Sequence, residues 1–178
     1  MKAKEFIDIS TRGRVAFSIN CLENSINCQN LRISNDCEKL LLQQLWHFTS
    51  DNIALWELQI KELIPFVVSE EVDYLIKDYN YFSKKVHDIL QNYYKQCNKY
   101  VLDIIDLIYE LGKTNVFVNI DSNDLKEATL PLLQEIIDLM MKNNMSLPNI
   151  KLFEKFSISE NNGLGREFAR EEIFNDNL

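Results

Sequence analysis

A run of mostly apolar positions lies between residues 100 and 112. On a helical wheel, its three acidic residues, Asp103, Asp106 and Glu110, fall within one narrow wedge, and the other positions are apolar or aromatic. A helix that is apolar around most of its circumference is buried on most sides, so the pattern predicts a central helix with one acidic edge. We expect Gly112 to end this helix, because glycine adopts the left-handed cap conformation without strain.

Further apolar stripes at helical spacing occur along the rest of the chain. Val15, Ile19, Leu22 and Ile26 recur every three or four residues and therefore predict one face of a helix. In the first part of the chain, the pattern predicts a helical lead-in at Lys4 to Ile9, a helix capped by Ser10 or Thr11, and a loop at Asn30 to Asp36. Two helices follow, one capped by Ser34 or Asn35 and one that is capped within Thr49 to Asp51 and ends at Pro65. The second half is predicted to hold a long helix from Ser83 to Gly112 with room for a kink at Gln96 to Asn98, a helix that begins at Asp121 to Asn123, restarts at Pro131 and stops at Asn143-Asn144, and a short helix from Leu147 to Phe153.

Two segments fit this pattern less well. Residues 66–82 combine a helical start at Ser69 with aromatic residues that either pack under a loop or form an exposed patch. Residues 114–120 are rich in β-branched side chains, but a single strand would have no partner, so we expect a further helical turn there. Trp46 and Trp56 lie on adjoining predicted helices, and we expect them to meet in one aromatic cluster.

The composition agrees with an all-α fold. The chain of 178 residues has only four glycines and three prolines, which are too few for the many tight turns of a β protein. We therefore predict a single all-helical domain over residues 1–178, an irregular bundle of about six to eight helices, with a helical-repeat array as the alternative. An irregular tail at about 156–178 is expected to be strapped to the body by Phe156 and Phe168. The predicted core includes Ile19, Leu22, Leu45, Trp46, Trp56, Ile105, Leu107, Ile108, Ile136 and Ile137.

The net charge of −8 narrows the classes of partner. Binding to nucleic acid requires clustered Lys and Arg, whereas the basic residues here are scattered, so no nucleic-acid partner is expected. The N-terminus has no signal-peptide pattern, and no apolar run reaches the roughly 18 residues of a membrane span. The four cysteines form no Cys-x-x-Cys pair, so free thiols in a cytoplasmic protein are the expected state.

The sequence contains no catalytic, cofactor or metal motif. His47 and His87 are far apart and no cysteine cluster accompanies them, so no zinc site is predicted. The Ser and Cys nucleophiles lack an identifiable His–acid pair. Gly163-Leu164-Gly165 is not a phosphate loop, because no strand precedes it and no Lys-Ser or Lys-Thr follows. We therefore predict a protein with no catalytic residue, no cofactor and no metal.

Negative charge is concentrated between residues 103 and 138, where eight acidic residues face only two lysines. Such an excess arises from solvated helix faces, from a surface that attracts a basic protein, or from paired catalytic carboxylates. The acids of residues 100–112 are held in place by the core, and irregular loops on a rigid scaffold often carry binding. We therefore place the predicted partner-binding surface on both segments. Its residues are Asp103, Asp106, Glu110, Ser157, Ser159, Glu160, Asn162, Gly163 and Gly165.

Several stretches of the chain together carry a family resemblance. They are residues 15–24, residues 45–50 with Trp56, residues 104–108, Leu147-Pro148-Asn149, and the Ser-Glu-Asn-Asn-Gly run that begins at Ser159. With these stretches the chain resembles a small family of all-helical bacterial proteins, some of which are similar to immunity proteins of polymorphic toxin systems. The resemblance implies a binding protein that neutralises a toxin, with a basic toxin domain as its partner. Two alternatives stay open: a helical scaffold or regulatory protein without a toxin partner, and an enzyme with an unrecognised site.

Overall fold

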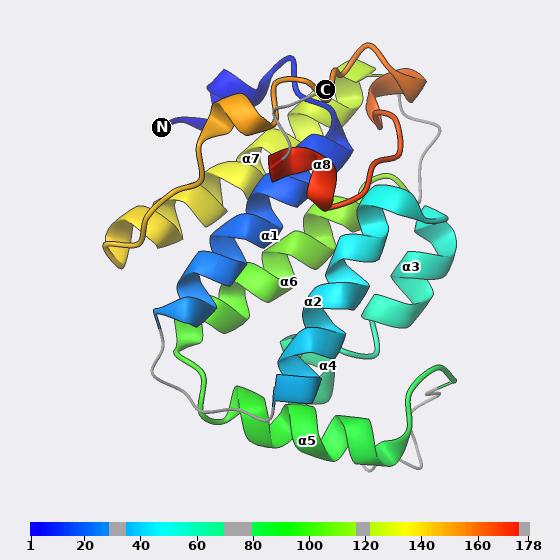
Figure 1. Ribbon diagram of the computed structural model, residues 1–178, viewed down its shortest axis with the longest axis vertical. Coiled ribbons are helices and arrows are strands. Elements are labelled where there is room, and N and C mark those ends of the chain that lie inside the picture. Colours follow the sequence, from blue (N-terminus) through cyan, green and yellow to red (C-terminus); the bar gives the residue numbers. More distant parts are fainter. Residues whose placement is uncertain (29–34, 70–79, 117–121, 175–178) are drawn as a thin grey trace.

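Helix α1 (Thr11–Asn27) crosses the middle of a helical bundle in the computed structural model (Figure 1). The structure describes residues 1–28, 35–69, 80–116 and 122–174, and their fold is an all-α single-domain bundle, as predicted. The other elements are η1 (Ala3–Phe6), α2 (Asn35–Ser50), α3 (Ile53–Ile60), α4 (Pro65–Val68), α5 (Lys84–Tyr94), α6 (Lys99–Lys113), α7 (Ser122–Lys142), η3 (Ile150–Leu152), η4 (Asn161–Gly163) and α8 (Glu171–Phe174).

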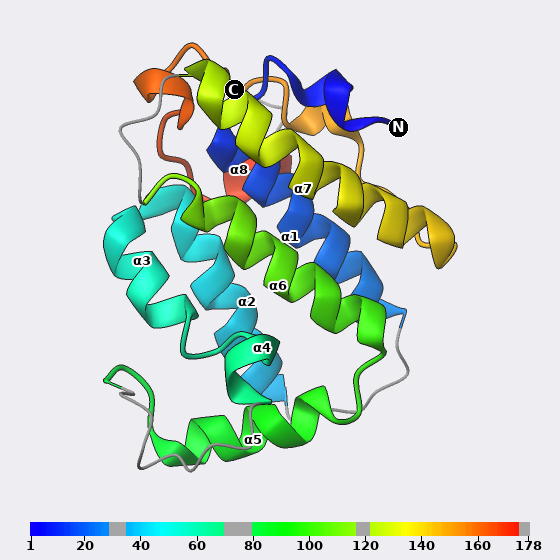
Figure 2. The ribbon, with the colours of Figure 1, turned by 180° about the vertical axis from the view of Figure 1, so that it is seen from behind.

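The helices are arranged around α1, which packs against α2, α6 and α7. Helices α6 and α7 pack against each other and run in opposite directions, and Figure 2 shows them in front of α1. Helices α3 and α4 pack against α6. Helix α5 crosses one end of the bundle, whereas the chain after α7 returns to the other end (Figure 1).

Helix α1 is the most deeply buried element, and the predicted central helix at residues 100–112, α6, packs against α1, α3, α4 and α7. Every residue from Thr11 to Leu22 is buried, whereas α6 keeps one half-exposed side. The polar residues of α1 tolerate burial because they bond within the helix. Ser18, Asn20 and Ser25 each donate to the carbonyl oxygen four residues earlier, at 2.9, 3.1 and 2.9 Å.

Arg14 places a fully buried positive charge near the start of α1. Its Nε and Nη2 donate to the carbonyl oxygen of Phe6 at 3.2 and 3.1 Å, and Nη2 also donates to that of Ile7 at 3.3 Å. Its Nη1 donates to the hydroxyl of Thr129 in α7 at 2.5 Å. Burial lowers the pKa of Arg14 to about 10, and the charge of Asp8 opposes this fall. The guanidinium therefore stays charged at neutral pH and ties η1 and α7 to α1.

The helix starts follow the predicted caps closely. Ser10 caps α1, and its hydroxyl accepts a hydrogen bond from the N–H of Gly13 at 3.3 Å. The cap of α3 is Asn52, one residue beyond the predicted segment, and its side chain accepts from the N–H of Leu55 at 3.1 Å. Asn144 has a φ of 56° and stops α7 where predicted.

Pro65, expected to end a helix, and Pro131, expected to restart one, have different roles in the structure. Pro65 begins α4 at its first position, and the preceding helix has already ended at Ile60. Ile64 is extended, as a residue before proline requires. Pro131 does not restart a helix, because α7 continues through it. The ring is exposed, so water can replace the hydrogen bond that proline cannot donate.

The long helix predicted from Ser83 to Gly112 is divided into α5 and α6. Helix α5 ends at Tyr94 and α6 begins at Lys99, so the break covers the predicted kink at Gln96 to Asn98. The predicted short helix after Leu147 is a 3-10 turn, η3, which Asn149 caps. Residues 29–34, 70–79, 117–121 and 175–178 lie outside the described residues, and so do the predictions that fall on them.

The predicted core is confirmed except for Leu107, which is half-buried. The two tryptophans do not form the predicted common cluster, because they face different neighbours. Trp56 packs edge-on against Phe48, with 4.8 Å between the ring centres. Trp46 instead donates from its indole N–H to Glu23 at 3.0 Å.

Gly112 serves close packing and not the predicted left-handed cap. Helix α6 continues to Lys113 and ends at Thr114 in the right-handed conformation. A Cβ at Gly112 would lie 2.5 Å from the Cη2 atom of Trp56 and 3.1 Å from the Cε2 atom of Phe48. The missing side chain therefore lets the indole of α3 pack directly against the backbone of α6.

We expect Gly112→Ala to destabilise the fold by about 1–3 kcal/mol, the usual range for an overpacked core. Replacing a helical glycine by alanine would otherwise stabilise a helix by about 1 kcal/mol, so a net loss isolates the clash with Trp56. Urea unfolding followed by circular dichroism measures the change. The loss should shrink in a Trp56→Phe background, where the ring is smaller. An alanine variant as stable as the wild type would contradict this role for Gly112.

Candidate functional site

A groove of about 490 Å³ lies between α6 and α7, the two helices in front of α1 in Figure 2. Its lining is mostly apolar, and Leu107 from α6 and Leu139 from α7 contribute to it. Carboxylates from both helices surround these leucines. The charged residues of the groove are Asp103, Asp106 and Glu110 on α6, and Glu135, Asp138 and Lys142 on α7.

Two of the five carboxylates in the groove have lysine partners on α6. Lys99 donates to both oxygens of Asp103 at 2.7 and 2.9 Å, and Lys113 donates to both oxygens of Glu110 at 2.9 and 3.0 Å. The Lys99 side chain is 85% exposed, and surface pairs of this kind contribute only about 0–1 kcal/mol. No ion pair joins the two α7 carboxylates to a described lysine or arginine. The groove therefore carries a net negative charge.

Asp106 is the carboxylate that the fold constrains most. Its Oδ1 accepts a hydrogen bond from the N–H of Phe66 at 3.2 Å, which joins α6 to α4. The pKa of Asp106 is raised to about 6, mainly by burial and to a lesser extent by the charges of Asp103 and Glu110. The hydrogen bond from Phe66 and the charge of Lys99 act against the rise. The charge of Asp106 therefore changes near pH 6.

A second pocket of about 430 Å³ lies between α3, α4 and α6 and shares Asp106 and Glu110 with the groove. The hydroxyl of Tyr109 donates to the buried carboxylate of Glu57 at 2.8 Å. Burial raises the pKa of Tyr109, and the hydrogen bond to Glu57 adds to the rise, so the phenol keeps its proton. These two groups satisfy each other, which is the arrangement of a structural contact. Phe66, which is 69% exposed, lies at the edge of this pocket.

The predicted tail residues lie apart from the groove and line no part of it. The N–H of Ser10 donates to the carbonyl of Phe156 at 2.8 Å, and the N–H of Arg12 donates to that of Leu164 at 3.0 Å. The tail therefore satisfies backbone donors at the start of α1 that no helical carbonyl can reach. The predicted strap is confirmed, because the rings of Phe156 and Phe168 are buried in the core and the N–H of Phe168 donates to the carbonyl of Thr49 in α2 at 3.0 Å.

Two of the predicted tail residues, Gly163 and Gly165, are buried. Gly165 has a φ of 90°, and a Cβ there would collide with the side chain of Ser10. Gly165 therefore lets the tail approach the first turn of α1 closely. Of the other predicted tail residues, Ser159 and Asn162 are exposed, and Ser157 and Glu160 are half-buried.

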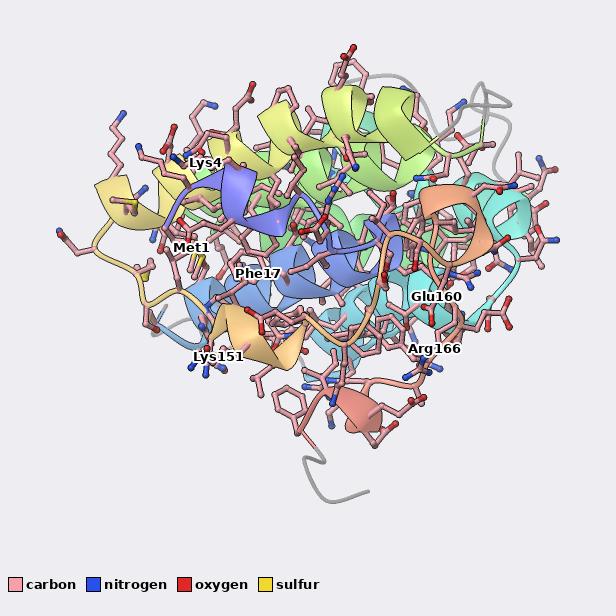
Figure 3. All side chains as sticks on the ribbon, turned by 90° about the horizontal axis from the view of Figure 1, so that it is seen from above. Met1, Lys4, Phe17, Lys151, Glu160 and Arg166 are labelled. Carbon is pink, nitrogen blue, oxygen red and sulfur yellow. The ribbon has the colours of Figure 1, made fainter. Side chains whose placement is uncertain are left out.

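The outer part of the tail is held by contacts of its own. The N–H of Arg166 donates to Glu160 at 3.3 Å, and its guanidinium pairs with Glu172 at 2.9 Å. Figure 3 shows Glu160 and Arg166 at the same end of the molecule. The hydroxyls of Ser157 and Ser159 lie 2.9 Å apart, within hydrogen-bonding distance. Much of the polar surface of the tail is therefore engaged within the chain.

No protein-family model, curated protein or solved structure matches this chain. A function for this protein is therefore inferred from the geometry of the groove. Within the described residues, no three His, Cys, Asp or Glu side chains are placed to hold a metal ion. None of the helices in the described ranges has the length and apolar character of a membrane span.

Sequence reasoning identified the α6 side of the groove and missed the α7 side. Glu135 and Asp138 contributed to the acidic excess but were not assigned to the predicted surface, and Leu139 and Lys142 were not considered. A signal for this side exists, since Glu135, Asp138 and Lys142 recur three and four residues apart, as the α6 acids do. The spacing alone does not show that the two edges face one groove, because that depends on how α6 packs against α7.

The raised pKa of Asp106 predicts a specific dependence of stability on pH. The native state binds this proton more tightly than the unfolded chain, so the stabilisation is present at low pH. It is lost as the pH rises from the ordinary pKa of 3.8 through about 6. Asp106→Asn should therefore gain stability relative to the wild type over that interval. Urea unfolding of both proteins across the interval measures this difference.

Asp88→Asn is the matched control for this measurement. It removes a helix-surface carboxylate that pairs with Lys84, four residues earlier, in the same geometry as Lys99 and Asp103. A difference between Asp106→Asn and the wild type that stays constant from about pH 4 to about pH 7 would contradict the assignment.

Proposed function

We propose that the protein is a non-catalytic binding protein whose groove between α6 and α7 receives a basic segment of a protein partner. The observation that carries this proposal is the set of five carboxylates from two facing helices around one mostly apolar groove. Apolar surface supplies affinity when it is covered, and the surrounding charges select the partner and speed its approach.

The rigidity of the two helices supports the proposal. Helices α6 and α7 pack against each other and on α1, so the bundle fixes the positions of their carboxylates. A fixed negative patch of this kind raises the association rate of a basic partner by roughly 10–10³-fold. The exposed ion pairs of Lys99 and Lys113 are weak, so arginine or lysine from a partner can displace them.

The resemblance to immunity proteins makes the basic domain of a bacterial toxin the proposed partner, encountered in the cytoplasm. The net charge of −8 is consistent with such a partner. A helical scaffold or regulatory protein without a toxin is the main alternative. A toxin gene beside the gene for this protein would favour immunity, and its absence would favour the scaffold.

A charge-removing variant tests the groove. Asp103→Asn, Asp106→Asn and Glu110→Gln together keep the side-chain shapes and remove three charges from α6. We expect affinity purification from the source cells to recover a basic protein with the wild type and much less of it with this triple variant. With the purified pair, association should slow by about 10-fold or more at low salt. The difference should shrink near 1 M salt, where the screening length is about 3 Å.

The matched control removes three exposed carboxylates outside the groove, by Asp88→Asn, Glu127→Gln and Glu154→Gln. It changes the net charge by the same amount, so it separates the groove from overall charge. We expect the control to bind like the wild type. If association slows equally in both triple variants, the net charge of the protein and not the groove causes the effect. If the groove variant binds like the wild type, the proposed site is refuted.

A further inference from the structure

We propose that the groove between α6 and α7 binds an amphipathic α-helix of the partner, with leucine-like side chains on one face and Lys or Arg on both flanks. This inference rests on the proposed function and adds the conformation and side-chain pattern of the bound segment. Its basis is the match between an apolar lining, charges on both rims, and the helical spacing of those charges.

The spacing of the rim charges favours a helix over an extended segment. On α6 the acids lie at positions 103, 106 and 110, and on α7 the charged residues lie at 135, 138 and 142. Each rim therefore has a charge about every 4.5–6 Å along its helix, because the rise is about 1.5 Å per residue. Residues on one face of a partner helix recur at the same interval, about 5.4 Å per turn. Same-face residues of an extended chain recur about every 6.6 Å and fall out of register within two repeats.

The arrangement of the helices gives the groove the shape that a third helix requires. Helix α1 already packs against both α6 and α7 from one side. The groove lies between α6 and α7, and no helix of the described part of the chain lies in front of this pair in Figure 2. A partner helix there would pack its side-chain ridges between those of α6 and α7, as helices in bundles do. Leu107 and Leu139, both half-buried, would lie under its apolar face.

Charge complementarity defines the flanks of the bound helix. The α6 rim contributes Asp103, Asp106 and Glu110, and the α7 rim contributes Glu135 and Asp138. A helix with cations on only one flank would leave one acidic rim unmatched, so we infer cations on both. Lys142 is the one positive residue among those that line the groove, and an acidic residue or a helix end of the partner fits beside it.

Synthetic peptides test the conformation directly, with the full chain as the receptor. The first probe is a capped peptide of about 14 residues, four turns of helix, with leucines on one face, lysines on both flanks and alanines elsewhere. The second has the same composition but alternates leucine and lysine at every second position, the pattern of a strand. The third is the first peptide with one central Ala→Pro change, which breaks a helix. Fluorescence anisotropy measures the dissociation constants, and circular dichroism measures the helix content of the peptide on binding.

We expect the helical peptide to bind at least about 10-fold more tightly than either of the others and to gain helicity. Leu139→Gln should weaken it by about 10-fold, because the half-buried Leu139 would lose its apolar contact with the leucine face of the peptide. Leu55→Gln is the matched control, because Leu55 is 47% exposed on α3 and lies outside the groove. Thermal unfolding of both variants checks that they remain folded.

The outcomes separate this inference from the proposed function. If all three peptides bind the wild type equally and all bind the groove triple variant more weakly, the groove does not select a helix, but it still binds basic segments. If the helical peptide binds tightly, needs Leu139 and binds the triple variant as tightly as the wild type, the groove binds a helix as proposed, and the electrostatic part of the proposed function is wrong. If the helical peptide does not bind the wild type, the proposal that the groove binds an amphipathic helix is refuted.

Discussion

The buried guanidinium of Arg14 holds together the elements on which the groove depends. It donates to carbonyl oxygens of Phe6 and Ile7 in the N-terminal segment and to the hydroxyl of Thr129 in α7. Leaving such buried acceptors without donors costs about 1–3 kcal/mol each, so the three elements are fixed as a unit. Because α7 carries one rim of the groove, a charge buried far from solvent sets the position of carboxylates at the surface.

The other rim is positioned by two contacts of α6. Gly112 allows the indole of Trp56 to pack against the helix backbone, which fixes how closely α3 approaches. Asp106 accepts the N–H of Phe66 and so attaches α4 beside the groove. The same burial that fixes Asp106 also raises its pKa, so structure and charge are coupled at this residue. The acidic edge is therefore a consequence of core packing, as the sequence pattern suggested.

Local signals predicted the elements of the fold well, whereas long-range packing was out of their reach. The cap at Ser10 and the apolar stripe of α1 follow from residues close in sequence. The burial of α1 on nearly all sides was not predicted, because Ser18 and Asn20 count as polar in a periodicity argument, although they bond to their own helix. The acidic edge of α6 was predictable from spacing along one helix, but the same local signal misjudged Gly112 as a helix cap. Spacing shows which residues share a helix face, but not what lies opposite, such as Trp56 beside Gly112 or α7 beside the acids.

The central claim is that the surface between α6 and α7, and not the tail, binds a basic segment. A titration of isotopically labelled protein with the helical leucine–lysine peptide, followed by amide chemical shifts in NMR, tests it most directly. The account predicts that the largest shift changes map to residues 103–110 and 135–142, with little change at residues 157–165. Changes centred on residues 157–165, or spread evenly over the acidic surface, would contradict it.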